Sequence, residues 1–341
     1  MLHFDSDYME GCYPDILDRL KAINYEKNTG YGTDVYSHSA KTKILKACGL
    51  DNGEVYFLVG GTQTNATVIS SVLRNYEGVI SASSGHISVH EAGAIEFSGH
   101  KVLEIPSQNG KLSANELKAY LDTFYNDGNR EHMVQPGMVY ISFPTEYGTL
   151  YTADQLSDIH SVCKAYNIPL FVDGARLGYG IMAENNEVSL EFLAHNCDIF
   201  YIGGTKVGAM FGEAVVLTQK NMIPHFFTMI KQQGALLAKG FITGVQFDTL
   251  FTDNLYFNIA KNAITQANKI KETLVSKGYK IYIDSPTNQI FVILNNDKLN
   301  ELSKNVSFSF WEKYDDNSTV VRFATSWATS DKDTEKLCQL L

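Results

Sequence analysis

Strand-like and helix-like segments alternate through the middle of the chain, and this alternation restricts the possible folds more than any other feature. Short apolar runs expected as strands cover residues 55–59, 79–82, 102–106, 138–143, 169–172, 199–202 and 213–218. Most of these runs are separated by stretches with helical periodicity. Strands that alternate with helices pair in parallel through right-handed crossovers. We therefore predict an α/β fold with a mostly parallel central sheet and helices on both faces.

The pattern changes after about residue 250. A long helix is expected over 258–277, followed by shorter strands and a final helix over 332–341. The shorter strands are expected at 281–283, 290–294, 306–314 and 320–324. We predict an N-terminal arm (1–14), a large α/β domain (15–250) and a small C-terminal α+β domain (251–341). The polar and aromatic N-terminal residues either cap the core or fold over a site, in this chain or in a neighbouring subunit.

Composition narrows the class of protein. The 341 residues are 44% hydrophobic and carry a net charge of −10, with no dense basic run. Nucleic acid and anionic membranes are therefore not expected partners. The N-terminus lacks the basic and apolar regions of a signal peptide, and no apolar run reaches the length of a membrane span. The five cysteines are scattered, with no C-x-x-C pair, so we expect reduced thiols and a cytoplasmic protein.

Candidate ligand-binding groups follow three of the expected strands. Gly60-Gly61-Thr62 follows the first, Asp173 ends the run at 169–172, and Lys206 follows the run at 199–202. Open α/β sheets bind ligands beyond the carboxyl ends of their strands. A glycine turn before a helix presents free N–H groups to an anion. The spacing matches neither the dinucleotide fingerprint nor the Walker lysine loop, which disfavours a dehydrogenase or a triphosphate site.

Lys206 stands among glycines and other small residues after an apolar run. A buried lysine has a lowered pKa and serves as an amine nucleophile that forms imines. The alternative is a structural lysine that extends to solvent beside a glycine turn. Lys206 would bind an aldehyde, the loop at 60–65 a phosphate, and Asp173 a ring nitrogen, while the His86 imidazole would stack on the ring. Together these groups predict a site for pyridoxal 5′-phosphate.

Two arginines are candidates for binding a substrate carboxylate. Arg176 stands three residues after Asp173, and Arg322 lies within a β-rich apolar run. Arginine suits this role because its planar guanidinium binds carboxylates in bidentate fashion. The alternative for each is a surface ion pair.

These motifs resemble the threonine aldolase and β-eliminating lyase group of fold type I pyridoxal-phosphate enzymes. The resemblance covers nearly the whole chain, in the segments SDYMEGCYP, TDVYS, VGGTQTN, GHISVHEAGA, FVDGARLGYG, GGTKVG and VVRFATSWATS. The most specific match is FVDGAR, whose Asp173 precedes Lys206 by 33 residues.

The resemblance implies a role for each matching position. Lys206 would carry the cofactor, Asp173 would pair with its ring nitrogen, and His86 would stack on the ring. The phosphate would lie at Gly61, Thr62 and Gln63. Ser6, Arg176 and Arg322 would surround the substrate carboxylate, with Arg176 also beside the cofactor. Members of the group are usually dimers or tetramers that share active sites, and Lys239 would reach the phosphate of a neighbouring subunit.

Three positions depart from the group's pattern. Thr205-Lys206-Val207 replaces a serine-lysine-glycine sequence, Glu146 stands in a loop where a second histidine is common, and Trp327 replaces a smaller or more polar residue. The second histidine is thought to address the β-hydroxyl of the substrate, so Glu146 bears on the side-chain preference.

The sequence thus predicts a lyase that cleaves a β-hydroxy-α-amino acid, such as L-threonine or L-allo-threonine, to glycine and an aldehyde. The base that removes the β-hydroxyl proton would be His86, Glu146 or a bound water. The alternative with the same cofactor is β-elimination or other α-carbon chemistry, with Lys206 as the base. A non-enzymatic binding protein with a structural lysine is the rival from a different class. No metal site is expected.

Overall fold

The computed structural model describes all residues, 1–341, and contains one large sheet and two smaller ones. The large sheet has seven strands in the order β2-β8-β7-β6-β5-β3-β4. Their bounds are β2 Glu54–Leu58, β3 Glu77–Ala82, β4 Lys101–Ile105, β5 Gln135–Ser142, β6 Leu170–Asp173, β7 Ile199–Gly203 and β8 Glu213–Leu217. Only β8 runs antiparallel to its neighbours. The predicted mostly parallel sheet is therefore confirmed.

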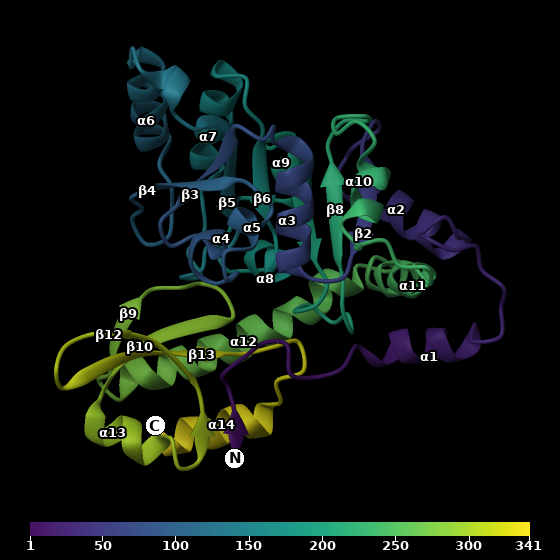
Figure 1. Ribbon diagram of the computed structural model, residues 1–341. Helices are drawn as coiled ribbons and strands as arrows, with labels where there is room; N and C mark the ends of the chain where they lie inside the picture. The colour runs from purple at the N-terminus through teal and green to yellow at the C-terminus, as the bar shows by residue number, and fades with distance from the viewer.

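Helices cover both faces of this sheet, as predicted (Figure 1). Successive residues of a strand point to opposite faces, and β7 shows the consequence. Phe200 and Ile202 pack into one apolar cluster, whereas Ile199 and Tyr201 pack into another. The first cluster includes residues of α1 Pro14–Ala22, α2 Val35–Ala47, α6 Ala114–Asn126, α7 Ala153–Ala165, α8 Leu177–Ile181, α9 Leu190–His195, α11 Phe241–Leu250 and α12 Leu255–Ser276. The second includes residues of α3 Gly61–Val72, α4 His86–Val89, α5 Ala94–Phe97 and α10 Phe226–Gln232.

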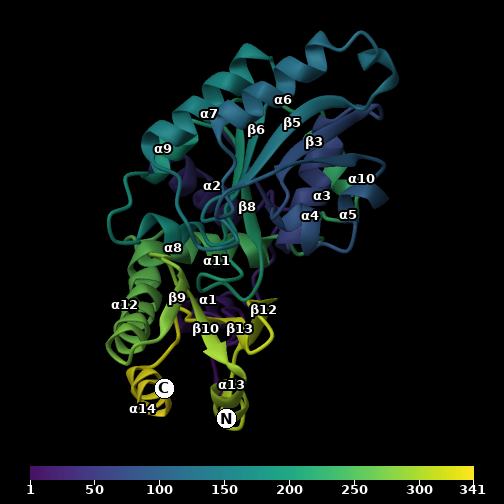
Figure 2. The ribbon, with the colours of Figure 1, turned by 90° about the vertical axis from the view of Figure 1, so that its left-hand side faces the viewer.

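A smaller unit contains an antiparallel sheet in the order β12-β13-β10-β9. Its strands are β9 Lys280–Ile283, β10 Gln289–Asn295, β12 Ser309–Lys313 and β13 Ser318–Ala324. It packs with α12, α13 Asn296–Leu302 and α14 Asp331–Leu340 around a third apolar cluster. Figure 2 shows this unit at one end of the molecule, below the large sheet and beside both chain termini.

One expected strand is divided in the structure. The run at 306–314 forms two strands, β11 Val306–Ser307 and β12. β11 pairs in parallel with β1 Leu2–His3 at the N-terminus, whereas β12 pairs with β13. The N-terminal segment therefore adds its backbone to the small unit, and this pairing draws residues 306–307 away from β12.

Side-chain caps set the start of several helices, and hydrophobic periodicity does not reveal these caps. α2 begins at Val35, because Asp34 accepts hydrogen bonds from the Ser37 backbone N–H and hydroxyl. α9 begins at Leu190, after the Ser189 cap. A side-chain oxygen at this position satisfies one of the free N–H groups of the first turn. No helix has the length and apolarity that a bilayer span requires.

Candidate active site

A cavity of about 350 Å³ lies at the carboxyl ends of the parallel strands. Its lining brings together residues from five of the sequence motifs: Gly61, Thr62, His86, Glu146, Asp173, Arg176 and Lys206. A second space of about 430 Å³ shares six of the lining residues and is bounded by Ser309, Phe310, Trp311 and Arg322 of the small unit. The candidate site therefore lies where the large sheet faces the antiparallel sheet.

Backbone packing fixes the two segments that carry Asp173 and Lys206. The Gly203 N–H donates to the Gly174 carbonyl at 2.9 Å, which ties the end of β7 to the turn after β6. A Cβ at Gly203 would lie 2.3 Å from the Ala175 carbonyl oxygen. Only glycine allows this close approach. The packing explains the glycine that precedes the lysine turn.

Asp173 is a buried carboxylate that accepts hydrogen bonds from four donors. Its Oδ1 accepts from Tyr201 Oη at 2.5 Å and from the Ala175 N–H at 3.0 Å. Its Oδ2 accepts from Tyr140 Oη at 2.7 Å and from Asn65 Nδ2 at 3.0 Å. Burial raises the pKa of Asp173, but the His86 charge and these donors outweigh burial and lower it. Asp173 is thus held as an anion inside the cavity.

The N-terminus of α3 opens onto the same cavity. Gly60 precedes the helix and supplies no side-chain cap, and the Thr64 N–H bonds back to the Gly60 carbonyl. The N–H groups before Thr64 have no partner within the helix. A Cβ at Gly61 would lie 3.2 Å from Tyr201 Oη, so the backbone passes close to the tyrosine that holds Asp173. This end of α3 is a suitable place for an anion.

Lys206 extends into the cavity with an amine that makes no ion pair. Burial and the charge of Arg176 lower its pKa to about 8, although Asp7, Asp173 and Glu213 oppose the shift. Its Nζ lies 5.8 Å from the centre of the Tyr8 ring. A lysine in this state exchanges between ammonium and free amine close to neutral pH, as an amine nucleophile requires.

His86 is oriented by two carboxylates. Its Nδ1 lies 2.7 Å from Oε1 of the buried Glu91, and its backbone N–H donates to Glu146 Oε1 at 2.8 Å. Glu146 Oε1 also accepts from Ser142 Oγ at 2.6 Å, whereas its Oε2 has no partner in the chain. Burial raises the pKa of Glu146. The cavity therefore contains an imidazole with a fixed ring and a carboxyl group able to bind a proton.

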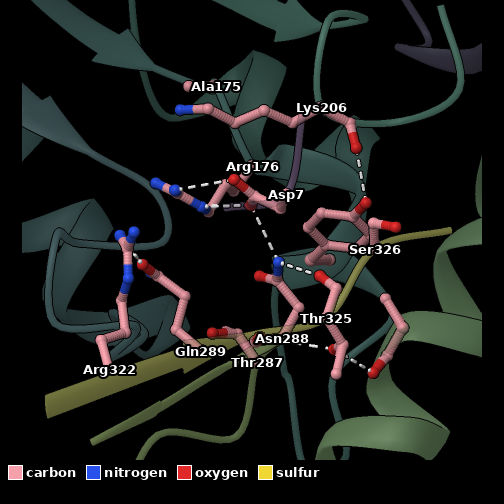
Figure 3. Close-up of polar contacts among 12 residues, drawn as sticks. Asp7, Ala175, Arg176, Lys206, Thr287, Asn288, Gln289, Arg322, Thr325 and Ser326 are labelled. Carbon is pink, nitrogen blue, oxygen red and sulfur yellow. Dashed lines mark hydrogen bonds and ion pairs between the residues drawn. The ribbon is translucent and has the colours of Figure 1, made fainter. Parts of the chain in front are cut away.

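Both candidate arginines bond to residues of the N-terminal segment, Arg176 to Asp7 and Arg322 to Asp5. Figure 3 shows Arg176 with Asp7 and Arg322 with Gln289. Arg176 Nε and Nη2 donate to Asp7 Oδ2 at 2.7 Å and Oδ1 at 3.0 Å. Arg322 donates to the Asp5 carbonyl and Ser309 Oγ through Nη2 and to Gln289 Oε1 through Nη1. Burial and the charge of Arg176 lower the pKa of Arg322 to about 10. Neither arginine is a surface ion pair.

The remaining predicted residues divide into those near the cavity and those away from it. Ser6 lies between the two arginine partners, Asp5 and Asp7, and its buried hydroxyl has no partner. Gln63 accepts from the Val59 N–H at 3.2 Å, and the cavity wall does not include it. Lys239 is exposed on the turn before α11, outside the cavity of its own chain. Its expected role toward a neighbouring subunit stays a prediction.

Trp327 does not line either cavity. Its ring packs against Tyr13 with 5.9 Å between ring centres, and its backbone N–H donates to Tyr179 Oη at 3.2 Å. The departure at this position therefore affects packing of the N-terminal segment and not the cavity wall.

Although some stand within the quoted motif segments, several residues of the site have no role predicted from the sequence. They are Asp7, Asn65, Glu91, Tyr140, Tyr201, Glu213 and Trp311. One signal was available for Glu213, a charged residue that opens an otherwise apolar strand. The tyrosines look like ordinary core residues in the sequence, and only the strand order places their hydroxyl groups on Asp173.

Comparison with known proteins agrees with this geometry. Residues 3–296 match the family model described as β-eliminating lyase. A low-specificity L-threonine aldolase from a Pseudomonas strain is 26% identical, over 98% of this chain and 95% of the relative. A solved structure of the Leishmania major threonine aldolase is 39% identical, covers 100% of this chain and 98% of its own, and has a TM-score of 0.96.

A more distant structure shares the fold alone. The Thermus thermophilus aspartate aminotransferase is 15% identical, over 99% of this chain and 95% of its own, with a TM-score of 0.71. The predicted fold type I architecture and the resemblance to threonine aldolases are confirmed. With the family model spanning most of its length, the chain belongs to the β-eliminating lyase family.

Proposed function

We propose that this protein is a pyridoxal-phosphate-dependent aldolase that cleaves a β-hydroxy-α-amino acid of the threonine type to glycine and an aldehyde. The observation that carries the proposal is the meeting of Lys206, Asp173 and the open N-terminus of α3 in one cavity. The relatives named as threonine aldolases match over nearly the full length of the chain, which supports the same chemistry here.

The residues of the cavity fit the cofactor. The uncapped N–H groups at Gly61 and Thr62 suit its phosphate, with Gln63 at the next position of the same turn. The anionic Asp173 suits a protonated ring nitrogen, His86 suits the ring face, and Lys206 offers the amine for the aldehyde. Bound there, pyridoxal phosphate supplies an electrophilic carbon for amines and a ring that accepts the electron pair of the broken bond.

Unpaired donors mark the place for the substrate carboxylate. Arg322 Nε and Ser6 Oγ are both buried without a partner in the chain. Buried polar groups are nearly always hydrogen-bonded, so unpaired ones indicate a missing ligand. We propose that these two groups, with the Arg176 N–H groups that Asp7 leaves free, bind the carboxylate. Asp7 then keeps Arg176 in position.

Proton transfer at the β-hydroxyl is assigned to the pair of Glu146 and His86. The free Oε2 of Glu146 can accept the hydroxyl proton while the Cα–Cβ bond breaks, and the raised pKa of Glu146 suits this step near neutral pH. His86 is the second acceptor, because Glu91 occupies its Nδ1 and leaves Nε2 open. The hydroxyl oxygen becomes the carbonyl oxygen of the aldehyde, and the α-carbon gains a proton to give glycine.

The name of the family supports a second reaction at the same site. In β-elimination, a base removes the Cα proton and a substituent leaves from Cβ. Lys206 is the candidate base, because its lowered pKa makes the free amine available near neutral pH.

We also propose that the protein forms a homodimer or homotetramer with shared sites. The basis is the resemblance to a group whose members are usually dimers or tetramers that share active sites. The exposed Lys239, which lies outside the cavity of its own chain, is the candidate for the shared residue. Its ammonium would reach the phosphate bound by a partner. Lys239→Ala should weaken cofactor binding without changing the oligomeric state in light scattering, and unchanged cofactor binding would remove Lys239 from the site.

The test begins with absorbance spectra of the protein with pyridoxal phosphate, for the wild type and Lys206→Ala. We expect a yellow protein that loses its long-wavelength band in the mutant, and glycine plus acetaldehyde from L-threonine or L-allo-threonine. Glu146→Gln should lower kcat about 100-fold if it accepts the hydroxyl proton. Colour without acetaldehyde would favour β-elimination. A protein that does not bind the cofactor would refute both reactions.

A further inference from the structure

Glu213 is a buried carboxyl group in the cavity that no step of the proposed reaction uses. It opens β8 opposite Gly203 of β7, and only 3% of the residue is exposed. Its side chain lines the same cavity as Lys206 and Asp173. A carboxyl group at this depth is costly unless it is paired or hydrogen-bonded, so its contacts indicate what it does.

Both oxygens of Glu213 hold the turn that leads to Lys206. Oε2 accepts from the Gly204 N–H at 3.1 Å, and Oε1 accepts from Thr205 Oγ1 at 2.8 Å. Thr205 Oγ1 in turn accepts from the Gly212 N–H at 3.0 Å. The Gly204 and Thr205 N–H groups also donate to the Gly212 carbonyl. Glu213 thus connects the two ends of the turn 204–212.

Neither Glu213 nor Lys206 forms an ion pair, because the other charged groups around the cavity have their own partners. Arg176 is paired with Asp7, and Arg322 with neutral acceptors, while Glu213 receives only the two neutral donors. Lys206 makes no ion pair; it faces Asp7 and Tyr8 of the N-terminal segment, Asp173 and Arg176 after β6, and Glu213 of β8. Glu213 faces Lys206 and Asp173.

We propose that Glu213 is a positioning residue for Lys206. Glu213 holds the turn 204–212 and supplies the negative charge that the Lys206 amine faces from β8. Burial raises the pKa of Glu213 to about 8, close to the pKa of about 8 for Lys206, so both groups titrate over the same pH range. Where Glu213 is ionised, its charge stabilises the ammonium of Lys206. When the amine loses its proton to react, Glu213 binds a proton more readily, because the nearby positive charge has gone. The net charge of the pair then changes little during cofactor attachment.

The ionisation of the two groups agrees with this assignment. Burial raises the pKa of Glu213, and the charge of Lys206 acts against that rise. Burial lowers the pKa of Lys206, and the charge of Glu213 acts against that fall. Each group therefore opposes the desolvation of the other, as linked titrating groups do.

The inference rests on the proposed role of Lys206, and the test separates the two. Protein without cofactor is treated with pyridoxal phosphate and borohydride over a range of pH, and labelling of Lys206 is measured by peptide mass spectrometry. In Glu213→Gln, the amide oxygen can accept from the Gly204 N–H and the NH₂ can donate to Thr205 Oγ1. The midpoint of labelling should fall by about one pH unit because the negative charge is gone. Glu213→Asp, which keeps the charge, should return the midpoint toward the wild-type value.

Glu54→Gln is the matched control. Glu54 lies at the opposite end of the β2–β8 ladder, paired with Leu217, and should leave the midpoint unchanged. Thermal unfolding of each variant confirms that it is folded. Equal midpoints in the wild type and Glu213→Gln would refute the role of Glu213. The absence of Lys206 labelling in the wild type at any pH would instead refute the proposed function. If Glu213→Gln does not fold, failure of Glu213→Asp to keep the wild-type midpoint would overturn the proposal.

Discussion

Single residues of this protein gain their chemistry from the donors and charges around them. Asp173 is the clearest case, because four donors surround a carboxylate that burial alone would neutralise. Three of these donors are side chains from α3, β5 and β7, so the charge depends on three separate elements. This negative charge is the one that the proposed function assigns to the ring nitrogen of the cofactor.

Asp173→Asn should weaken the binding of pyridoxal phosphate at least tenfold, because the amide carries no charge and its NH₂ faces groups that donate. An absorbance titration of cofactor-free protein measures the dissociation constant. Asp198→Asn is the control, since Asp198 is also buried and bonded but precedes β7 at its opposite end. Equal losses of affinity in both variants would contradict a specific role for Asp173.

At the scale of elements, close backbone contacts fix the strand ends that carry the site. A side chain at Gly203 would meet backbone atoms of Ala175, which cannot move aside as a flexible side chain can. The close packing of the turn after β6 against the turn after β7 therefore depends on one glycine. Any residue larger than glycine at this place should disturb both turns.

Gly203→Ala should lower the free energy of unfolding by about 1–3 kcal/mol through overpacking. It should also weaken cofactor binding, since Asp173 and Lys206 would move apart. Urea unfolding and the cofactor titration measure the two effects. Gly128→Ala, where an added Cβ meets nothing within 4 Å, should change neither. Wild-type stability in Gly203→Ala would show that the contact relaxes at no cost.

Asp198 links α7 and β6 to the start of β7 and makes stability depend on pH. Its carboxylate binds Lys164 and accepts from the Leu170 N–H at 2.9 Å. Burial raises the pKa of Asp198, but His160 at 3.5 Å and the hydrogen bonds from Lys164 and the Leu170 N–H outweigh burial and lower it to about 2. Because the pKa is lowered in the folded state, the stabilising contribution of Asp198 is complete above the unfolded-state pKa of about 4. This contribution is lost as the pH falls toward about 2.

Asp198→Asn should therefore cost about 1–2 kcal/mol at pH 7, after allowance for the half-exposed Lys164. The difference from the wild type should shrink as the pH falls from 4 to 3. Urea unfolding at pH 7, 4 and 3 measures the trend. A difference that stays constant over this range would mean that the cost comes from packing and not from charge.

At the scale of the whole molecule, the N-terminal segment joins the two main parts around the cavity. Asp7 Oδ2 accepts from Arg176 Nε after β6 and from Asn288 Nδ2 before β10. The Phe4 carbonyl accepts from the Ala324 N–H of β13. The segment thus fastens the small unit to the large sheet and keeps Arg176 in the site. Of the two alternatives for this segment, capping the core and folding over a site, the structure combines both within one chain.

Asp7→Asn should lower the free energy of unfolding by about 3–5 kcal/mol, because Arg176 would stay buried without its carboxylate. It should also raise KM for the amino acid, since the guanidinium would lose its fixed position. Urea unfolding and steady-state kinetics measure these changes. Asp5→Asn is the control, because the Asp5 carboxylate contacts only the exposed His3. Similar losses in both variants would refute the coupling through Arg176.

The sequence by itself determined the α/β class, the positions of most strands, and the three strand ends that carry Gly61, Asp173 and Lys206. These features follow from local periodicity and from glycine turns, which act over a few residues and do not depend on distant packing. The resemblance of the motifs then supplied the proposed roles of the residues, and the comparisons confirmed the family.

Only the tertiary structure decided which distant groups meet in the cavity. Asp7 and Arg176 are 169 positions apart, and the Tyr140 and Tyr201 hydroxyl groups reach Asp173 because β5, β6 and β7 lie side by side. Glu213 enters the cavity because β8 runs antiparallel and begins where β7 ends. Burial and pairing of charges depend on strand order and direction, and no local pattern contains that information.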